Sequence, residues 1–103
     1  MSVTVIARLF PQEGSRQAML DAMATPLEAI RAEPGCERFA AHTAPDGSVV
    51  LIELWSSREA LAAHSRGTAI QELRAARAPF ESAAATVEVL EPEPLGGGPK
   101  ATL

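Results

Sequence analysis

The sequence of 103 residues has little cysteine, with Cys36 as its single example. One cysteine excludes an internal disulfide framework and a zinc site built from cysteine ligands. The sequence therefore predicts a reduced, cytoplasmic protein. Basic residues are also few: nine Lys and Arg against 13 Asp and Glu give a net charge of −4. Because nucleic acids and anionic membranes bind clustered positive charge, we expect neither as a partner.

Long apolar runs, targeting signals and cofactor motifs are missing as well. No stretch approaches the roughly 20 apolar residues that a membrane helix requires. Residues 1–8 lack the basic region and the cleavage site of a signal peptide, and they resemble a β-strand. No GxGxxG or P-loop pattern is present, so we expect no nucleotide cofactor. His42, His64 and Glu53 show no metal-ligand spacing, so we expect no metal site.

Hydrophobic periodicity and turn signals divide the chain into strands and helices. The predicted strands span residues 3–10, 36–43, 48–55 and 83–90. An apolar stripe with helical spacing predicts a helix from a cap at Ser15 to about Glu33, and Pro26 should kink or break it. Capping patterns predict two shorter helices, Ser56-x-x-Glu59 opening one to about His64 and Thr68-x-x-Gln71 opening one to Pro79.

This order of elements indicates a ferredoxin-like α+β fold, βαββαβ, in which helices cover one face of a four-stranded antiparallel sheet. We expect this domain over residues 1–91 and a flexible tail, rich in proline and glycine, over residues 92–103. The strand at residues 48–55 is apolar on both faces, so the sheet face without helices must also be covered. For so small a chain the expected cover is a second copy, which gives a homodimer through the open sheet face.

Three segments resemble signatures of the antibiotic biosynthesis monooxygenase (ABM) family in order and spacing. They are Pro11-x-x-Gly14, Arg31-Ala32-Glu33-Pro34-Gly35-Cys36, and Glu53-x-Trp55 followed by Ser57-Arg58-Glu59-Ala60-Leu61-x-x-His64. The resemblance covers about residues 3 to 91. It implies a dimeric α+β barrel of two ferredoxin-like subunits, with an apolar pocket between sheet and helices. Family members include oxygenases that oxidise quinols or anthrones without metal, flavin or haem. Other relatives degrade haem, isomerise lactones or have no known activity.

His64 is the candidate catalytic residue. It lies one turn after Leu61 near the end of a short helix, where its ring would reach the mouth of the pocket. An imidazole titrates near neutral pH, which suits proton abstraction from a phenol or an activated methylene. The resemblance adds that this residue matches a histidine that recurs in the family. The alternative is a structural histidine that caps helix carbonyls.

Four further residues are candidates for substrate binding. Trp55 and Glu53 project from one face of the third strand, where Trp55 would wall an aromatic substrate and Glu53 would be a buried carboxylate. Structural roles, as a core indole and a hydrogen-bonded carboxylate, remain the alternatives. On the second strand, Phe39 faces the pocket or the barrel interior, and His42 faces the pocket, the dimer interface or solvent. Three arginines are expected on a solvated helix face: Arg66, Arg74 and Arg77.

Two functions of different classes are compatible with these residues. The preferred one is a cofactor-independent monooxygenase, with O2 and a small aromatic substrate: an electron-rich hydroquinone, anthrone or polycyclic phenol that becomes a quinone. His64 would take a substrate proton, and the resulting anion would pass an electron to O2. The alternative is a non-catalytic binding or stress-related protein for small aromatic metabolites. The absence of tyrosine favours this alternative, since aromatic-oxidising relatives can use tyrosine for substrate contacts. An isomerase on the same fold is a third possibility.

Overall fold

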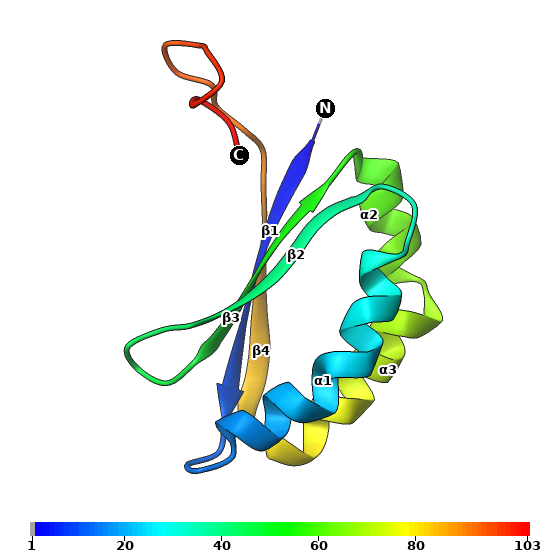
Figure 1. The fold of residues 1–103 in the computed structure, drawn as a ribbon, viewed down its shortest axis with the longest axis vertical. Coiled ribbons are helices and arrows are strands. Elements are labelled where there is room, and N and C mark those ends of the chain that lie inside the picture. The colour runs from blue at the N-terminus through cyan, green and yellow to red at the C-terminus, as the bar shows by residue number, and fades with distance from the viewer. Residues whose placement is uncertain (1) are drawn as a thin grey trace.

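The computed structural model describes residues 2–103 and places all of the helices on one face of an antiparallel sheet (Figure 1). The elements in chain order are β1 (Val3–Pro11), α1 (Arg16–Arg31), β2 (Cys36–Thr43), β3 (Val49–Trp55), α2 (Arg58–Ser65), α3 (Thr68–Arg77), a short 3₁₀ helix (Ala78–Phe80) and β4 (Glu81–Leu90). The four strands lie in the order β2-β3-β1-β4, and every neighbouring pair is antiparallel. This architecture confirms the predicted ferredoxin-like βαββαβ fold.

The central strands have two apolar faces, as the sequence predicts. Along β3, buried and half-buried residues alternate, with Leu51 and Trp55 turned toward the helices and Ile52 turned away from them. β1 pairs with β3 in the same phase, so that Ile6 lies opposite Ile52 on the open face. One face therefore builds the core beneath the helices, and the other leaves half-buried apolar side chains without a covering layer.

Helix α1 runs through Pro26 without a break, so of the two expected outcomes, a kink or a break, the break is wrong. Proline removes one backbone hydrogen bond from a helix interior and crowds the preceding turn. Here Pro26 is itself buried, on the same side of the helix as Met19, Met23 and Ile30. Burial of this apolar stripe against the sheet offsets the lost hydrogen bond and keeps the helix continuous.

The helix starts differ from the predicted capping patterns by one residue in two places. Ser57, and not Ser56, caps α2, and its Oγ accepts a hydrogen bond from the Ala60 N–H. The residue that precedes α3 is Gly67, and Thr68 is the first helical residue. Ser15 stands at the start of α1 as predicted, but its side chain makes no capping hydrogen bond. Neighbouring candidates with similar cap propensity explain these differences.

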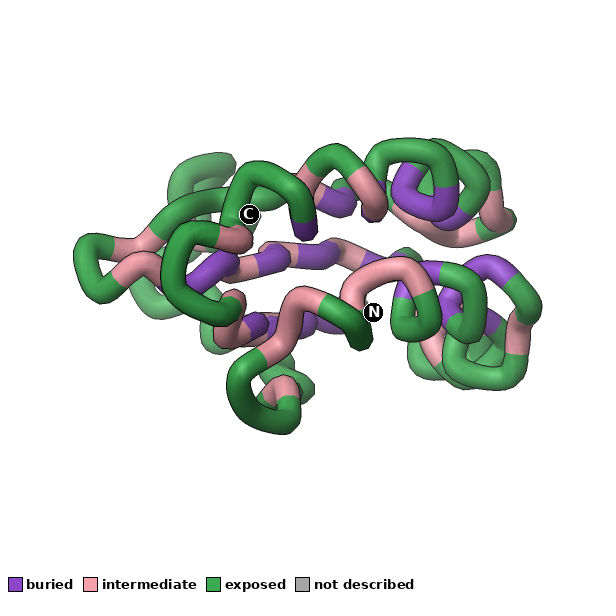
Figure 2. The backbone as a smooth tube through the Cα atoms, turned by 90° about the horizontal axis from the view of Figure 1, so that it is seen from below, coloured by how far each residue is buried: buried purple, intermediate pink, exposed green. Residues whose placement is uncertain are grey.

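The core lies between the sheet and the helices (Figure 2). Its largest fully buried side chains are Trp55, Leu9, Met19, Met23, Ile30, Leu51 and Leu73, which come from both layers. The strand β4 takes little part in it, because Val87 and Val89 remain exposed although they pair with inward-facing residues of β1. The core is therefore built on β1, β3 and Phe39 of β2, and it is open beside β4.

The chain after β4 forms turns and bends and lies beyond the end of the sheet, near the start of β1 (Figure 1). Glu91, at its start, forms an ion pair with Arg58 of α2. The flexibility expected of residues 92–103 stays a prediction. Within residues 2–103, no helix combines the length and the apolar character needed to cross a membrane.

Candidate active site

A cavity of about 540 Å³ lies between the sheet and the helices α2 and α3, on the side where β4 is uncovered. Most of its lining is apolar: Val5, Ala7, Phe39, Leu51, Leu61, Ile70, Leu73, Val87 and Val89. Its principal titratable groups are Glu53, His64, Arg74, Arg77 and Glu81. An apolar cavity with a few convergent polar groups is typical of a small-molecule site.

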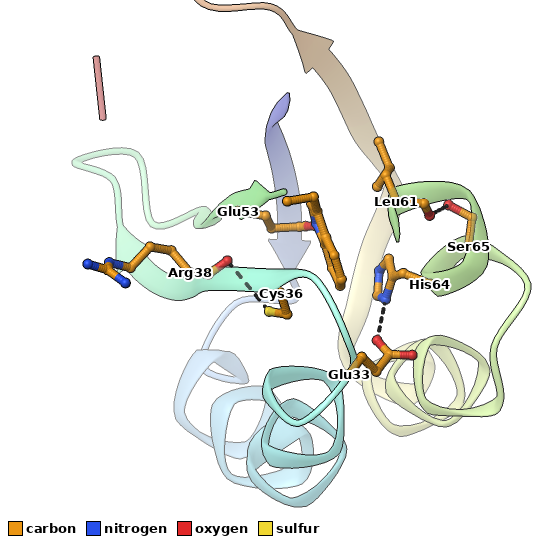
Figure 3. Close-up of polar contacts among 8 residues, drawn as sticks. Glu33, Cys36, Arg38, Glu53, Leu61, His64 and Ser65 are labelled. Carbon is orange, nitrogen blue, oxygen red and sulfur yellow. Dashed lines mark hydrogen bonds and ion pairs between the residues drawn. The ribbon is translucent and has the colours of Figure 1, made fainter. Parts of the chain in front are cut away.

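His64 is buried at the wall of this cavity, with 5% of its side chain exposed. Its Nδ1 lies 2.7 Å from Oε1 of Glu33, which comes from the turn between α1 and β2 (Figure 3). The ring also stacks on Trp55, with 4.4 Å between ring centroids, and meets Phe39 edge-on at 6.1 Å. One polar and two aromatic contacts therefore fix the position of this imidazole.

The second nitrogen of His64 remains available to a ligand. Within residues 2–103, no fully buried side-chain nitrogen or oxygen lacks a hydrogen-bond partner. The hydrogen bond of this imidazole is made by Nδ1, so Nε2 must be accessible from the cavity that the ring lines. Nε2 can therefore accept or donate a proton to a bound molecule.

The turn that carries Glu33 packs closely against α2. Gly35 has a left-handed backbone conformation, with φ of +84°, and its carbonyl accepts a hydrogen bond of 2.8 Å from the Ser56 N–H. A Cβ at Gly35 would lie 2.4 Å from Cβ of Ala60, closer than any side chain allows. The glycine therefore permits the approach that brings Glu33 next to His64.

Glu53 is a buried carboxyl group at the same end of the cavity, 5% exposed. Its Oε1 accepts a hydrogen bond of 3.0 Å from Nε1 of Trp55. Burial raises the pKa of Glu53 from 4.5 to about 7, against the opposing effects of the Trp55 hydrogen bond and the Arg77 charge. Near neutral pH this group therefore exists in both protonation states, which suits a proton donor and acceptor.

The expectation that Arg77 lies on a solvated helix face is wrong. Arg66 and Arg74 are exposed, and Arg74 also borders the cavity, whereas the Arg77 side chain in the cavity lining is only 12% exposed. Its Nε donates to Oε1 of Glu81 at 3.1 Å. Arg77 follows Leu73 by one turn of α3, so it shares the inward face of that helix. This spacing could have identified it from the sequence.

The structure brings together four of the five predicted site residues: His64, Trp55, Glu53 and Phe39. Trp55 does not wall the cavity as expected, because it is fully buried and contacts Glu53 and His64 instead, which corresponds to the alternative of a core indole. His42 is not among them, because it is exposed and pairs with Val50 of β3, whose side chain faces away from the helices. Glu33 was missed by sequence reasoning. It lies 31 positions before His64 in the chain, and only its place inside one of the family-like segments marked it.

Two other features of the described chain bear on the choice of site. A cavity of about 420 Å³ lies between the open sheet face and the C-terminal turns, next to Thr4, Leu54 and Leu90. Its titratable side chain, Glu91, is already paired with Arg58, whereas the cavity of His64 has several titratable side chains. Across residues 2–103, no three His, Cys, Asp or Glu side chains are arranged to hold a metal ion.

Comparisons with known proteins identify the family and support the fold. The family model for antibiotic biosynthesis monooxygenase matches residues 2–76, from β1 into α3. The chain belongs to the antibiotic biosynthesis monooxygenase family. The match includes Glu33, Glu53, Trp55 and His64, so the polar end of the cavity lies within the family domain. The recognition made from the sequence is confirmed.

Individual relatives support the same fold. The chain is 44% identical over 66 residues to a Mycobacterium tuberculosis protein named "Putative monooxygenase Rv0793", a match that spans 60% of this chain and 62% of that protein. The solved structure of Rv0793 has a TM-score of 0.81 at 30% identity and covers 94% of this chain and 100% of its own.

Two more distant structures show the fold alone. A conserved protein from Methanosarcina mazei Go1 has a TM-score of 0.80 at 14% identity, covering 87% of this chain and 91% of that chain. Protein SO0527 from Shewanella oneidensis has a TM-score of 0.75 at 23% identity, covering 86% of this chain and 88% of that chain.

Proposed function

We propose that this protein is a cofactor-independent monooxygenase that oxidises an electron-rich hydroquinone, anthrone or polycyclic phenol with O2 to a quinone. The observation that carries the proposal is the presence of a base and an acid in the lining of one apolar cavity. His64 offers a free Nε2, and Glu53 has a pKa of about 7. Family membership supports the reaction class.

The cavity suits a flat, apolar substrate with a few oxygen atoms. Its volume of about 540 Å³ falls in the range, roughly 300–1,000 Å³, that holds small organic ligands. Apolar side chains of β1, β3, β4 and α3 would contact the rings, and the oxygen atoms would lie toward His64 and Glu53. A substrate bound in this cavity would displace water from around the reacting atoms, and the apolar walls would accommodate O2.

The proposed reaction needs no external reductant, because the substrate supplies all four electrons. With an anthrone, Nε2 of His64 takes a proton from the methylene, and the carbanion passes one electron to O2. The substrate radical and superoxide join to form the new C–O bond, and Glu53 gives its proton to the peroxide anion.

Loss of water then completes the quinone. The ionised Glu53 takes the second C–H proton, and the electron pair of that bond forms the carbonyl as the O–O bond breaks. Hydroxide leaves and receives the proton held by His64, so water is released and both residues regain their starting states. One oxygen atom is in the quinone and the other in water. The guanidinium of Arg77 lies close enough to influence Glu53 and would favour its ionised form in this step.

Oxygen uptake by purified, metal-free protein tests the proposal, with a panel of hydroquinones and one anthrone as substrates. We expect uptake above the spontaneous rate that survives a chelator. His64→Ala should lower the rate by about 10²- to 10⁴-fold, the usual contribution of a general base. His42→Ala is the matched control, because it removes the other histidine on the opposite side of the sheet.

The other functions predict different results in the same assay. Quenching of Trp55 fluorescence by these compounds without oxygen uptake would favour a non-catalytic binding protein. Conversion of substrate without oxygen uptake would favour an isomerase. An unchanged rate in His64→Ala would remove His64 from the role of base.

We also propose that the open sheet face binds a second copy of the chain. Ile6, Val50, Ile52 and Leu54 lie side by side on this face and are only half-buried in the single chain. Burying apolar area of this kind contributes roughly 25 cal/mol per Å² to association. Sedimentation should give twice the chain mass of 10.8 kDa. Ile52→Glu should yield the single-chain mass, and a single-chain mass for the unaltered protein would refute the dimer.

A further inference from the structure

We propose that Glu33 is a positioning residue that holds His64 in the Nδ1–H tautomer and thereby leaves Nε2 as the proton acceptor. A carboxylate can only accept hydrogen bonds, so the nitrogen that faces it must carry the proton. Nε2, on the far side of the ring, then presents its lone pair to the cavity. The catalytic part of this inference rests on the proposed function, whereas the choice of tautomer does not.

The contacts around the ring leave it one orientation. The 2.7 Å separation between Oε1 of Glu33 and Nδ1 of His64 is that of a short hydrogen bond with a charged acceptor. Trp55 stacks on one face of the imidazole, and Phe39 meets it edge-on. Turning the ring over would place a carbon atom against Glu33 and leave this carboxylate without its partner. The aromatic contacts hold the plane of the ring, and the carboxylate selects which way it faces.

Two glycines leave the space that the Glu33 carboxylate occupies. Gly35 allows the turn that carries Glu33 to pack against α2. On the other side, Gly67 stands between α2 and α3, and a Cβ there would lie 3.1 Å from Oε2 of Glu33. The φ of Gly67 is −78°, which any residue can adopt, so the backbone conformation does not require glycine here. A side chain at this position would instead occupy the space that Glu33 needs. Glycines at positions 35 and 67 therefore leave room for the Glu33 side chain beside His64.

Other charged groups near the ring do not compete for Nδ1. Glu53, on β3, is hydrogen-bonded to Trp55. Arg77, on α3, pairs with Glu81 at the start of β4. Cys36 lies on β2, where burial raises the pKa of its thiol and keeps it uncharged. Glu33 is thus the carboxylate that determines the tautomer.

Nitrogen-15 NMR of the two histidine rings tests the inference directly, since the protonated and unprotonated ring nitrogens have distinct chemical shifts. At pH 8 without substrate, we expect His64 of the unaltered protein as the Nδ1–H tautomer. Glu33→Leu, similar in size but without an acceptor, should convert it to the Nε2–H tautomer. Glu72→Leu, at an exposed position of α3, is the matched control and should leave the spectrum of His64 unchanged. His42 lies on the opposite face of the sheet from Glu33 and serves as an internal reference in every sample.

The outcomes are separable from those of the proposed function. An Nε2–H tautomer in the unaltered protein, or an unchanged Nδ1–H tautomer in folded Glu33→Leu, would overturn the inference. If Glu33→Leu does not fold, Glu33→Gln replaces it. An amide can accept or donate, so we then expect signals of both tautomers, and a pure Nδ1–H signal would count against the inference. In oxygen uptake, Glu33→Leu should lower kcat by roughly 10²-fold with KM within about twofold. The His64→Ala rate tests the proposed function by itself.

Discussion

Replacing Glu53 with glutamine should stabilise the protein increasingly as the pH rises. Burial raises the pKa of Glu53 from 4.5 to about 7, because the hydrogen bond from Trp55 and the charge of Arg77 replace only part of the lost hydration. The unfolded chain has the ordinary pKa, so the folded state binds more protons between pH 4.5 and about 7. Stability therefore falls as the pH rises through this window and is constant above it. The full loss is about 3 kcal/mol, since each tenfold change in an acidity constant is worth about 1.4 kcal/mol.

Urea unfolding at pH 4.5, 6, 7 and 8, at one protein concentration, measures this effect. Glu53→Gln keeps the size of the side chain and an oxygen that accepts from Nε1 of Trp55, but it cannot ionise. We expect the difference in unfolding free energy between variant and unaltered protein to grow by about 3 kcal/mol from pH 4.5 to pH 8. Glu72→Gln, at an exposed position of α3, is the control and should give a difference that does not depend on pH.

The direction in which the difference in unfolding free energy changes with pH tests whether burial raises the pKa of Glu53. A difference that stays constant with pH would show that Glu53 has the same pKa in the folded and unfolded chains, and the proposed proton donor would be lost. A difference that shrinks as the pH rises would mean that the folded state favours the ionised carboxylate. The guanidinium of Arg77 would then outweigh desolvation, opposite to the balance argued from the structure.

Three further predictions concern the turn, the helix cap and the open side of the cavity. Gly35→Ala should destabilise the protein by about 2 kcal/mol or more in urea unfolding, because φ is +84° and the added Cβ meets Ala60; an unchanged midpoint would show that the turn can move away from α2. Ser57→Ala should cost about 1 kcal/mol by the same measurement through loss of the α2 cap, and no loss would mean that solvent satisfies the Ala60 N–H equally well. Val87→Phe, at an exposed position that lines the cavity, should raise KM in oxygen uptake by about tenfold with little change in stability; an unaltered KM would place the substrate elsewhere.

The fold could be predicted from the sequence because its signals are local and agree with one another. The two apolar faces of β3 and the stripe of α1 each follow from a fixed residue spacing. The errors arose where a local rule met tertiary packing. Pro26 should interrupt an isolated helix, but its ring is buried with the rest of the stripe. Ser57 caps α2 where Ser56 was predicted, because both residues have the same hydroxyl group and only the packing of the turn distinguishes them.

Most residues of the candidate site could be predicted from the sequence, but the contact between His64 and Glu33 could not. Alternation along β3 placed Glu53 and Trp55 on one face, which is a two-residue relation. The pairing of His64 with Glu33 depends instead on how a turn packs against a helix, and no spacing in the sequence encodes it. The exposure of His42 was left open for the same reason, since a residue on an edge strand can face either layer. Long-range contacts of this kind require the tertiary structure.

Trp55 links the two acid–base groups of the cavity, and their burial is hard to explain by stability. The indole is fully buried, donates to Glu53 and stacks on His64. Apolar residues of similar volume at positions 53 and 64 would avoid the desolvation of two ionisable groups, and such replacements are often neutral or stabilising. Burial instead gives Glu53 a pKa of about 7. A carboxyl group with a pKa of about 7 and an imidazole, both in contact with one indole and open to one cavity, form an arrangement that costs stability and suits proton transfer. This cost in stability is what the proposed function predicts, since it requires both groups to exchange protons with a ligand in that cavity.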